Sequence, residues 1–192
     1  MDKPCRHADM MEIPLYRQIL AAGFETLDGP LQRFHSLQGR HSLQGRCSIH
    51  GAEHAIGKMI CMLLRLPQPC ANAEFGFELL ATSDLEVWTR RFPRRVMRSS
   101  LRRAADGKLA ERIGPVRLGF SLIATDGRLS MRLDRIRVLG LPWPRRWFPF
   151  VWAIEHGADG RFHFDVGARF LRLGLLVAYS GHLELPAAAV GA

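Results

Sequence analysis

The sequence lacks the features that carry a protein into or across a membrane. Its most apolar helical stretch, residues 55–66, is interrupted by Lys58 and Arg65 and has about half the length that a bilayer span requires. The first nine residues contain no apolar segment of the kind that a cleaved signal peptide needs. The four cysteines form no C-x-x-C pair, which argues against a zinc knuckle or a thioredoxin-type site. We therefore expect a cytoplasmic protein whose thiols are free.

The common catalytic and nucleotide-binding signatures are missing as well. No strand-linked G-x-G-x-x-G, P-loop, G-x-S-x-G or Cys/His dyad pattern occurs. At 192 residues, the chain is too short to hold a Rossmann domain together with a substrate domain. The sequence therefore predicts no cofactor and no metal, and it contains no catalytic motif above chance.

Lysine is scarce, whereas arginine is abundant. Three of the 27 basic residues are lysines, and the formal net charge is +9. Such a charge favours anionic surfaces in a salt-dependent way, so we expect weak contact with the inner face of the membrane. Arginines gather in residues 88–103 around Trp88 and Phe92. This pattern is typical of a nucleic-acid surface or of a solvated strand face. No nucleic-acid-binding motif accompanies it, so specific nucleic-acid binding is not predicted.

Two helices and a short repeat precede a long strand-like region. Residues 13–27 have the apolar spacing of an amphipathic helix. Residues 53–66 are apolar on nearly every side, which predicts a helix that is buried or lies across a sheet or an apolar surface. Between them, the hexamer His35–Arg40 recurs as His41–Arg46, and we interpret it as a local duplication in a loop or strand entry.

From residue 73 onward the apolar period is two, as in half-buried antiparallel strands. Three Asp-Gly pairs, at residues 106–107, 126–127 and 159–160, predict hairpin turns. The apolar parity changes between Leu133 and Ile136 and again between Phe170 and Leu171, which predicts bulges or bends.

These patterns predict an α+β fold. We expect a curved, mostly antiparallel β-sheet or partial barrel of about seven to nine strands, with two or three N-terminal helices packed on it. The expected single domain covers residues 13–185, between a flexible N-terminus at 1–12 and a flexible C-terminal tail at 186–192.

An ordered series of short motifs resembles a bacterial family of uncharacterised domains. Members of that family are often fused behind an NAD(P)-binding domain of the saccharopine-dehydrogenase-like or short-chain-reductase-like kind. The resemblance runs over residues 15–185 and implies an accessory domain; the fused reductase half is absent from this sequence. The motifs are Arg33-Phe-His35, Gly45-Arg46-Cys47, Glu86-x-Trp88-x-Arg90-x-Phe92, Glu111-Arg-Ile-Gly-Pro115, Leu139-Gly-Leu-Pro142-x-Pro144, Gly160-Arg-Phe-x-Phe-Asp165 and Gly174-Leu-Leu-Val-x-Tyr179-x-Gly181.

Two local patterns could carry chemistry. His50-Gly51-Ala52-Glu53-His54 spells the H-x-x-E-H zinc signature, but that chemistry needs a helix across all five residues, and Gly51 stands at a strand-to-helix junction. If Asp159-Gly160 forms a two-residue turn, Glu155 faces Phe164 and its pKa is raised; a four-residue loop places it opposite Phe162. The alternative for Glu155 is an ion pair with an arginine.

We weigh two functions. In the first, an accessory or binding domain holds a hydrophobic, lipid-like molecule or acyl group in a cavity of the sheet. Its candidate ligand-binding residues are Phe75, Phe77, Trp88, Arg90, Phe120, Leu122, Trp143, Trp147, Glu155, Phe162, Phe164, Asp165 and Tyr179. The alternative is an enzyme, or the substrate-specifying partner of a separately encoded NAD(P)-dependent reductase. Its polar pocket would be formed by Glu86, Arg90, Glu111, Glu155, Asp165 and Tyr179.

Overall fold

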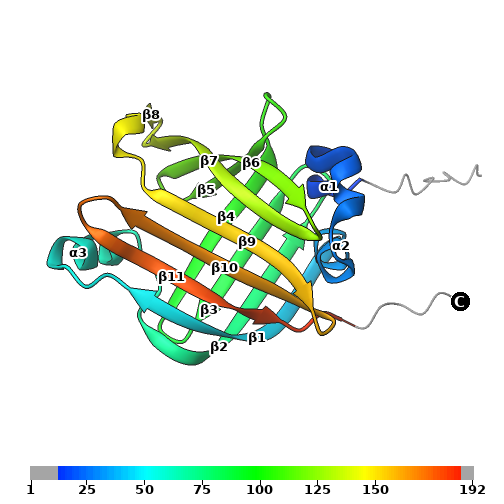
Figure 1. Ribbon diagram of the computed structural model, residues 1–192, viewed down its shortest axis with the longest axis horizontal. Coiled ribbons are helices and arrows are strands. Elements are labelled where there is room, and N and C mark those ends of the chain that lie inside the picture. The colour runs from blue at the N-terminus through cyan, green and yellow to red at the C-terminus, as the bar shows by residue number, and fades with distance from the viewer. Residues whose placement is uncertain (1–12, 187–192) are drawn as a thin grey trace, which may run out of the picture.

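Ten antiparallel strands close into a barrel, and a short eleventh strand pairs beside the end of one of them (Figure 1). The computed structural model describes residues 13–186. The barrel order is β6-β5-β4-β3-β2-β1-β11-β10-β9-β7, closed by pairing of β7 with β6, and β8 pairs with β7. The strands are β1 (Gly39–Gly51), β2 (Cys70–Ala81), β3 (Glu86–Phe92), β4 (Arg95–Arg103), β5 (Leu109–Ile113), β6 (Val116–Thr125), β7 (Arg128–Val138), β8 (Leu141–Pro142), β9 (Phe150–Ala158), β10 (Arg161–Phe170) and β11 (Gly174–Leu183).

The prediction of a partial barrel with seven to nine strands is wrong. The repeat region, which we interpreted as a loop or strand entry, lies largely within the thirteen-residue strand β1. The arginine-rich region 88–103 lies on two strands, β3 and β4, whose inward side chains include Trp88 and Met97. Closure depends on pairing between β1 and β11, the first and last strands of the chain, because the other barrel strands pair with their neighbours in sequence.

The helices also differ from the prediction. The N-terminal segment forms α1 (Leu15–Leu20), a 3-10 helix η1 (Ala21–Thr26) and α2 (Gly29–His35). A positive φ of 48° at Ala21 ends α1 early. The helix predicted at 53–66 is α3 (Ala55–Leu63); it follows β1 and is exposed rather than buried, because among its residues only Gly57 is buried. A second 3-10 helix, η2, covers Arg145–Trp147.

Two of the three predicted hairpin turns and one bulge are confirmed. Asp106-Gly107 also lies between two paired strands, β4 and β5, but there only the glycine has a positive φ. Asp126-Gly127 and Asp159-Gly160 both have positive φ at the two turn positions, as two-residue hairpins require. The second turn pairs Glu155 with Phe164, which is the register of the two-residue turn. The parity change before Ile136 is a bulge. Gly119 pairs with Arg135 and the next residue, Phe120, pairs with Leu133, so Asp134 is the extra residue of β7.

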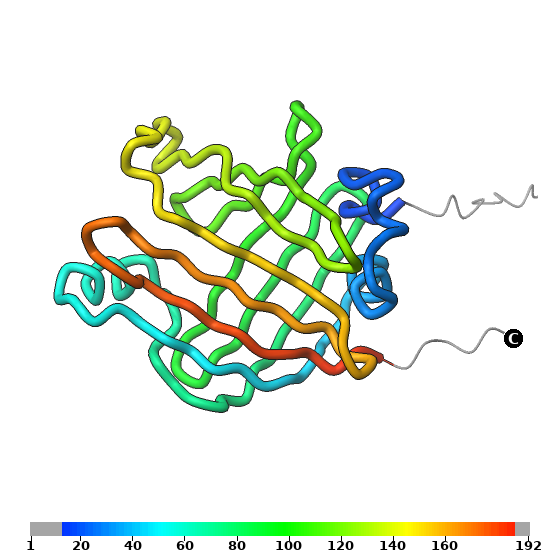
Figure 2. Tube along the Cα trace, viewed as in Figure 1, coloured from blue at the N-terminus to red at the C-terminus, as the bar shows by residue number. Residues whose placement is uncertain are grey.

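The two ends of the barrel differ (Figure 2). At one end, the capped end, lie α1, η1 and α2. They insert Tyr16, Phe24 and Phe34 into the core, where these side chains are almost fully buried. At the other end, the strand connections are residues 52–69, 93–94, 114–115, 139–149 and 171–173; we call these connections, together with Phe150 at the start of β9, the rim. Strands β7 and β9 pair only at Leu129 with Glu155 and at Ser130 with Ile154, so they part toward the rim.

Among residues 13–186, none of the helices is long and apolar enough to cross a bilayer. Cys47, Cys61 and Cys70 are free thiols, and Cys5 lies outside the described residues. The flexible ends predicted at 1–12 and 186–192 lie outside the described residues too, apart from Pro186. The prediction of one domain over 13–185 stays a prediction.

Candidate functional site

Polar side chains gather inside the barrel near its capped end. Because side chains alternate along a strand, Glu86, Trp88 and Arg90 of β3 all point inward with the apolar core. Burial of so many polar groups is unusual, since each must find a partner. We call the following residues the buried polar cluster: Tyr16, His35, Glu86, Arg90, Ser99, Glu111, Glu155 and Tyr179.

His35 and Glu155 form a buried pair at the centre of this cluster. His35 is the last residue of α2, and its Nε2 donates to Oε2 of Glu155 on β9 over 2.8 Å. The ring of Tyr16 stacks on the imidazole at 3.8 Å between centroids. The two side chains are 0% and 4% exposed, so each depends on the other for its hydrogen bond. Sequence reasoning offered an arginine as the partner of Glu155; the partner is a histidine.

Glu86 lies beside Trp88 on the same face of β3. The indole Nε1 of Trp88 donates to Oε2 of Glu86 over 2.8 Å. Burial raises the pKa of Glu86 from 4.5 to about 7, because a carboxylate charge is costly in a site that excludes water. Glu86 can therefore hold a proton near neutral pH.

The guanidinium of Arg90 is a buried positive charge that contacts side chains of two other strands. Its Nη1 donates to Oγ of Ser99 over 3.0 Å and lies 3.5 Å from Oε1 of Glu111. The guanidinium also lies over the ring of Trp88, 4.9 Å from its centroid, where a cation is attracted to the π face. Arg90 is thus held between β4, β5 and an aromatic ring.

Three buried atoms of the cluster have no hydrogen-bond partner within residues 13–186. They are the hydroxyl of Tyr16, Nδ1 of His35 and Oε1 of Glu111. Burial and then the nearby carboxylate of Glu155 raise the pKa of Tyr16 well above its usual value, so this phenol stays protonated and can donate. An unpaired buried polar atom costs about 1–3 kcal/mol, so these atoms are places where a polar group of another molecule would be stabilised.

The aromatic candidates lie around the cluster and pack on one another. Phe75 contacts Phe164 at 5.2 Å, and Phe34 stacks on Phe162 at 4.0 Å, both between ring centroids. Phe77 and Phe120 are buried in the same core, and Leu122 is half-buried against it. Toward the rim, the inward positions stay apolar but are only half-buried: Ile113, Leu118, Leu133, Val151 and Val166.

The structure separates three of the candidate residues from the others. Trp143 and Trp147 lie in the connection 139–149 at the rim, where Nε1 of Trp143 donates to the carbonyl of Trp147. Asp165 is exposed on the outer face of β10 and accepts a hydrogen bond from Trp152. The other candidates, including Trp88, Arg90, Glu155 and Tyr179, lie inside the barrel.

Sequence reasoning missed Tyr16, His35 and Ser99. Ser99 alternates with Met97 and Leu101 on β4, and this parity is the signal that would have placed it inside. Tyr16 lies in the predicted amphipathic helix 13–27, and His35 starts the repeat and ends the motif Arg33-Phe-His35. No local pattern in the sequence indicates that Tyr16 and His35 lie in the buried polar cluster.

The H-x-x-E-H pattern does not form a zinc-binding helix. His50 and Gly51 end β1, whereas Glu53 and His54 precede α3. Within the described part of the chain, no group of three or more His, Cys, Asp or Glu side chains could hold a metal ion.

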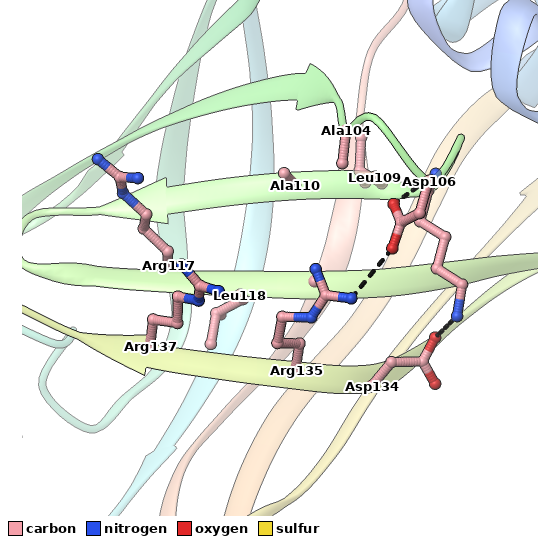
Figure 3. Close-up of a pocket in the computed structure, with 11 residues that line it drawn as sticks. Ala104, Asp106, Leu109, Ala110, Arg117, Leu118, Asp134, Arg135 and Arg137 are labelled. Carbon is pink, nitrogen blue, oxygen red and sulfur yellow. Dashed lines mark hydrogen bonds and ion pairs between the residues drawn. The ribbon is translucent and has the colours of Figure 1, made fainter. Parts of the chain in front are cut away.

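Two hollows lie away from the buried polar cluster and share no lining residue with it. The first, of about 220 Å³, lies against β5, β6 and β7 (Figure 3). Lys108 pairs there with Asp134 at 2.6 Å, and with Ser121 it lowers the pKa of Asp134 to about 2. Arg135 pairs with Asp106 at 3.2 Å. The second hollow, of about 570 Å³, is lined by Gln44, Gly45, Arg46, Glu74, Arg161, His182 and Glu184. Exposed ion pairs of this kind contribute little stability.

Comparison with known proteins gives a family. A family model described as "Domain of unknown function (DUF4166)" matches residues 27–183, and no curated protein matches the chain. The predicted resemblance to a family of uncharacterised domains is confirmed to that extent. A solved structure, titled "Crystal Structure of Rv2717c from M. tuberculosis", is similar at 13% identity with a TM-score of 0.44, over 83% of this chain and 99% of that one.

Proposed function

The chain belongs to the DUF4166 family of domains of unknown function, and we propose that its barrel binds a small lipid-like molecule. The ligand has an apolar body and one uncharged hydrogen-bonding group, such as a hydroxyl or a carbonyl. The domain acts as an accessory that holds this molecule rather than as a catalyst.

The observation that carries the proposal is the set of buried atoms without a hydrogen-bond partner. A ligand hydroxyl can donate to Nδ1 of His35 or to Oε1 of Glu111, and a hydroxyl or carbonyl can accept from Tyr16. The guanidinium of Arg90 already faces the carboxylate of Glu111, and the carboxylate of Glu155 already accepts from Nε2 of His35. A charged headgroup would therefore stay uncompensated in a site of low dielectric constant, which favours a neutral one.

The apolar body of the ligand would lie toward the rim. There the inward side chains are apolar and half-buried, and β7 parts from β9. Eight strands already suffice for a barrel that holds one small ligand, and ten strands enclose more space. Lipid-like molecules are scarce in water, so we infer that the domain works against a membrane surface. The free thiols of Cys47, Cys61 and Cys70 favour the cytoplasmic side of that membrane.

Ala153 offers a test of binding inside the barrel. It points inward beside the place where β7 and β9 part, whereas the next residue, Ile154, points outward. We expect purified protein to bind the neutral fluorescent probe N-phenyl-1-naphthylamine. We expect Ala153→Trp to weaken that binding at least about tenfold by filling the interior, and Ile154→Trp to leave it within about twofold.

Folding of both variants is checked by thermal unfolding. Equal probe affinity of the two folded variants would place the probe on the surface and refute binding inside the barrel. A wild-type protein that binds no probe and co-purifies with no lipid would refute the proposal altogether.

Tyr16 tests the polar part of the site. Tyr16→Phe removes a buried hydroxyl that has no partner, so we expect the free energy of unfolding to rise by about 1 kcal/mol. The same change should weaken displacement of the probe by 1-decanol about fivefold, since one neutral hydrogen bond is lost, while n-decane should compete as before. A variant that is clearly less stable than the wild type would show that the hydroxyl is already satisfied within the protein.

A second candidate function is an enzyme or the substrate-specifying partner of a separately encoded reductase. The observation in its favour is that five of its six proposed residues, all but Asp165, lie in the buried polar cluster. Fusion of related domains to NAD(P)-binding domains would fit this role. In that case a reductase, and not a lipid, should co-purify with the protein.

A further inference from the structure

Large apolar side chains are exposed at the rim of the barrel. Nine of the thirteen such side chains among residues 13–186 belong to it. Leu171, in the turn between β10 and β11, is 99% exposed, and Leu63 at the end of α3 is 80% exposed. Leu139 and Trp147 lie in the connection between β7 and β9 and are 80% and 54% exposed. Apolar groups gathered in this way mark an interaction surface.

These segments lie together at one end of the molecule. Figure 1 shows α3, the turn between β10 and β11 and the segment around β8 at the end opposite α1 and α2. The antiparallel order requires the same arrangement, because all these connections join strands at one edge of the barrel. Trp147 therefore lies on the same side of the molecule as Met62 and Leu171.

The strand connections at the two ends of the barrel differ in their charge. Within the described chain, the rim holds one acidic side chain, Glu53, and six basic ones, all exposed: Lys58, Arg65, Arg94, Arg145, Arg146 and Arg172. At the capped end, residues 13–38, 82–85, 104–108, 126–127, 159–160 and 184–186 together hold seven acidic and three basic side chains. An anionic surface therefore attracts the rim more strongly than the capped end, where arginines at the strand ends, such as Arg102 and Arg103, offset the acidic side chains.

Next to the rim, three arginines oppose one another across the outer face of the barrel. Arg112 of β5 pairs in register with Arg117 of β6, which pairs with Arg137 of β7. Like charges that face each other directly across strands destabilise a sheet. Anionic headgroups beside this row would relieve that repulsion.

We propose that the rim docks the protein on an anionic lipid bilayer. Leu63, Leu171 and Trp147 enter the boundary between headgroups and acyl chains, and Arg145 and Arg146 contact the phosphates. Arg146 lies 5.2 Å from the centroid of the Trp147 ring, so a cation and an aromatic ring reach the interface side by side. The docked molecule presents the capped end to the solvent.

The test uses the whole chain and lipid vesicles. We expect the protein to float with vesicles of phosphatidylcholine that contain about a quarter phosphatidylglycerol, but not with phosphatidylcholine alone. Arg145→Glu/Arg146→Glu should weaken this binding at least about tenfold. The matched control, Arg102→Glu/Arg103→Glu, changes the same charge at the capped end of β4 and should change the binding less than about twofold.

Apolar insertion is tested separately. Leu63→Asp/Leu171→Asp should abolish the part of the binding that survives about 1 M NaCl, and Ile123→Asp, an exposed apolar position on the wall of β6, should not. Equal binding of the rim variants and their controls, or binding that ignores phosphatidylglycerol, would overturn the proposal. So would a wild-type protein that binds no vesicles and dimerises through Leu63 and Leu171.

Docking of the rim and binding of a ligand in the barrel both involve a membrane, but they depend on different residues. Vesicle binding without binding of the neutral probe would leave docking intact and refute the ligand. The reverse result would leave the ligand intact and refute docking.

Discussion

Replacing Glu155 by alanine is expected to lower the free energy of unfolding by about 3–5 kcal/mol, because it leaves the buried ring of His35 without its partner. The imidazole lies in the capped end, between Tyr16 and the core, and water cannot reach it to replace the lost hydrogen bond. The carboxylate of Glu155 is thus required for the way in which α2 closes the barrel.

The measurement is urea unfolding followed by tryptophan fluorescence. The control is Glu25→Ala, which breaks an exposed ion pair of the same 2.8 Å length to Arg17 and should cost less than about 1 kcal/mol. Removing both buried partners, as in His35→Phe/Glu155→Leu, should cost less than the two single changes together. A loss below about 1 kcal/mol for Glu155→Ala would mean that the pair is not needed for stability.

The stability should also depend on pH through Glu86. Its pKa is raised from the ordinary value of 4.5 to about 7 in the folded protein, because burial disfavours the carboxylate. Between these two values the folded state keeps a proton that the unfolded state has lost. The stabilisation is therefore complete below pH 4.5 and is lost as the pH rises to about 7. The expected loss is about 3 kcal/mol over this range.

Glu86→Gln isolates this effect from the other groups that titrate in the same range. An amide keeps the acceptor for Trp88 but cannot ionise. The variant should be about as stable as the wild type near pH 4 and about 3 kcal/mol more stable near pH 8, measured by urea unfolding at both values. Parallel pH profiles of the two proteins would show that Glu86 ionises without cost.

Local turn chemistry could be predicted from the sequence, whereas closure of the barrel could not. Asp-Gly pairs favour positive φ, so Asp159-Gly160 predicted the observed register around Glu155 as one of two alternatives. The pairing of β6 with β7 is also local, through Asp126-Gly127. The pairing of β1 with β11 joins residues more than a hundred positions apart, and no local pattern specifies it.

The tandem repeat shows why local sequence was insufficient. In the first copy, His35 ends α2, and Gly39 has a φ of +81°. In the second copy, His41 and Gly45 lie within β1. Identical hexamers thus adopt different structures, because one adjoins a helix and the other pairs with β2 and β11. Tertiary context overrides intrinsic preference here.

The same reason explains which site residues could be found. Trp88, Arg90 and Glu155 lie at inward positions of strands, which alternation along the chain makes visible. Tyr16 and His35 reach the site from helices, and His35 meets Glu155 from 120 positions away. Such a meeting depends on how the helices enter the barrel, and alternation carries no information about that.

The short pairing between β7 and β9 makes this seam the weakest part of the barrel wall. β9 pairs with β10 at nine positions but with β7 at only two, so few backbone hydrogen bonds hold this junction. Amide protons on the facing edges should exchange with solvent through brief local openings that leave the remaining strands protected. Such local openings would widen the gap between β7 and β9 beside Ala153 much faster than the protein unfolds globally. No hinge or separate lid would be needed.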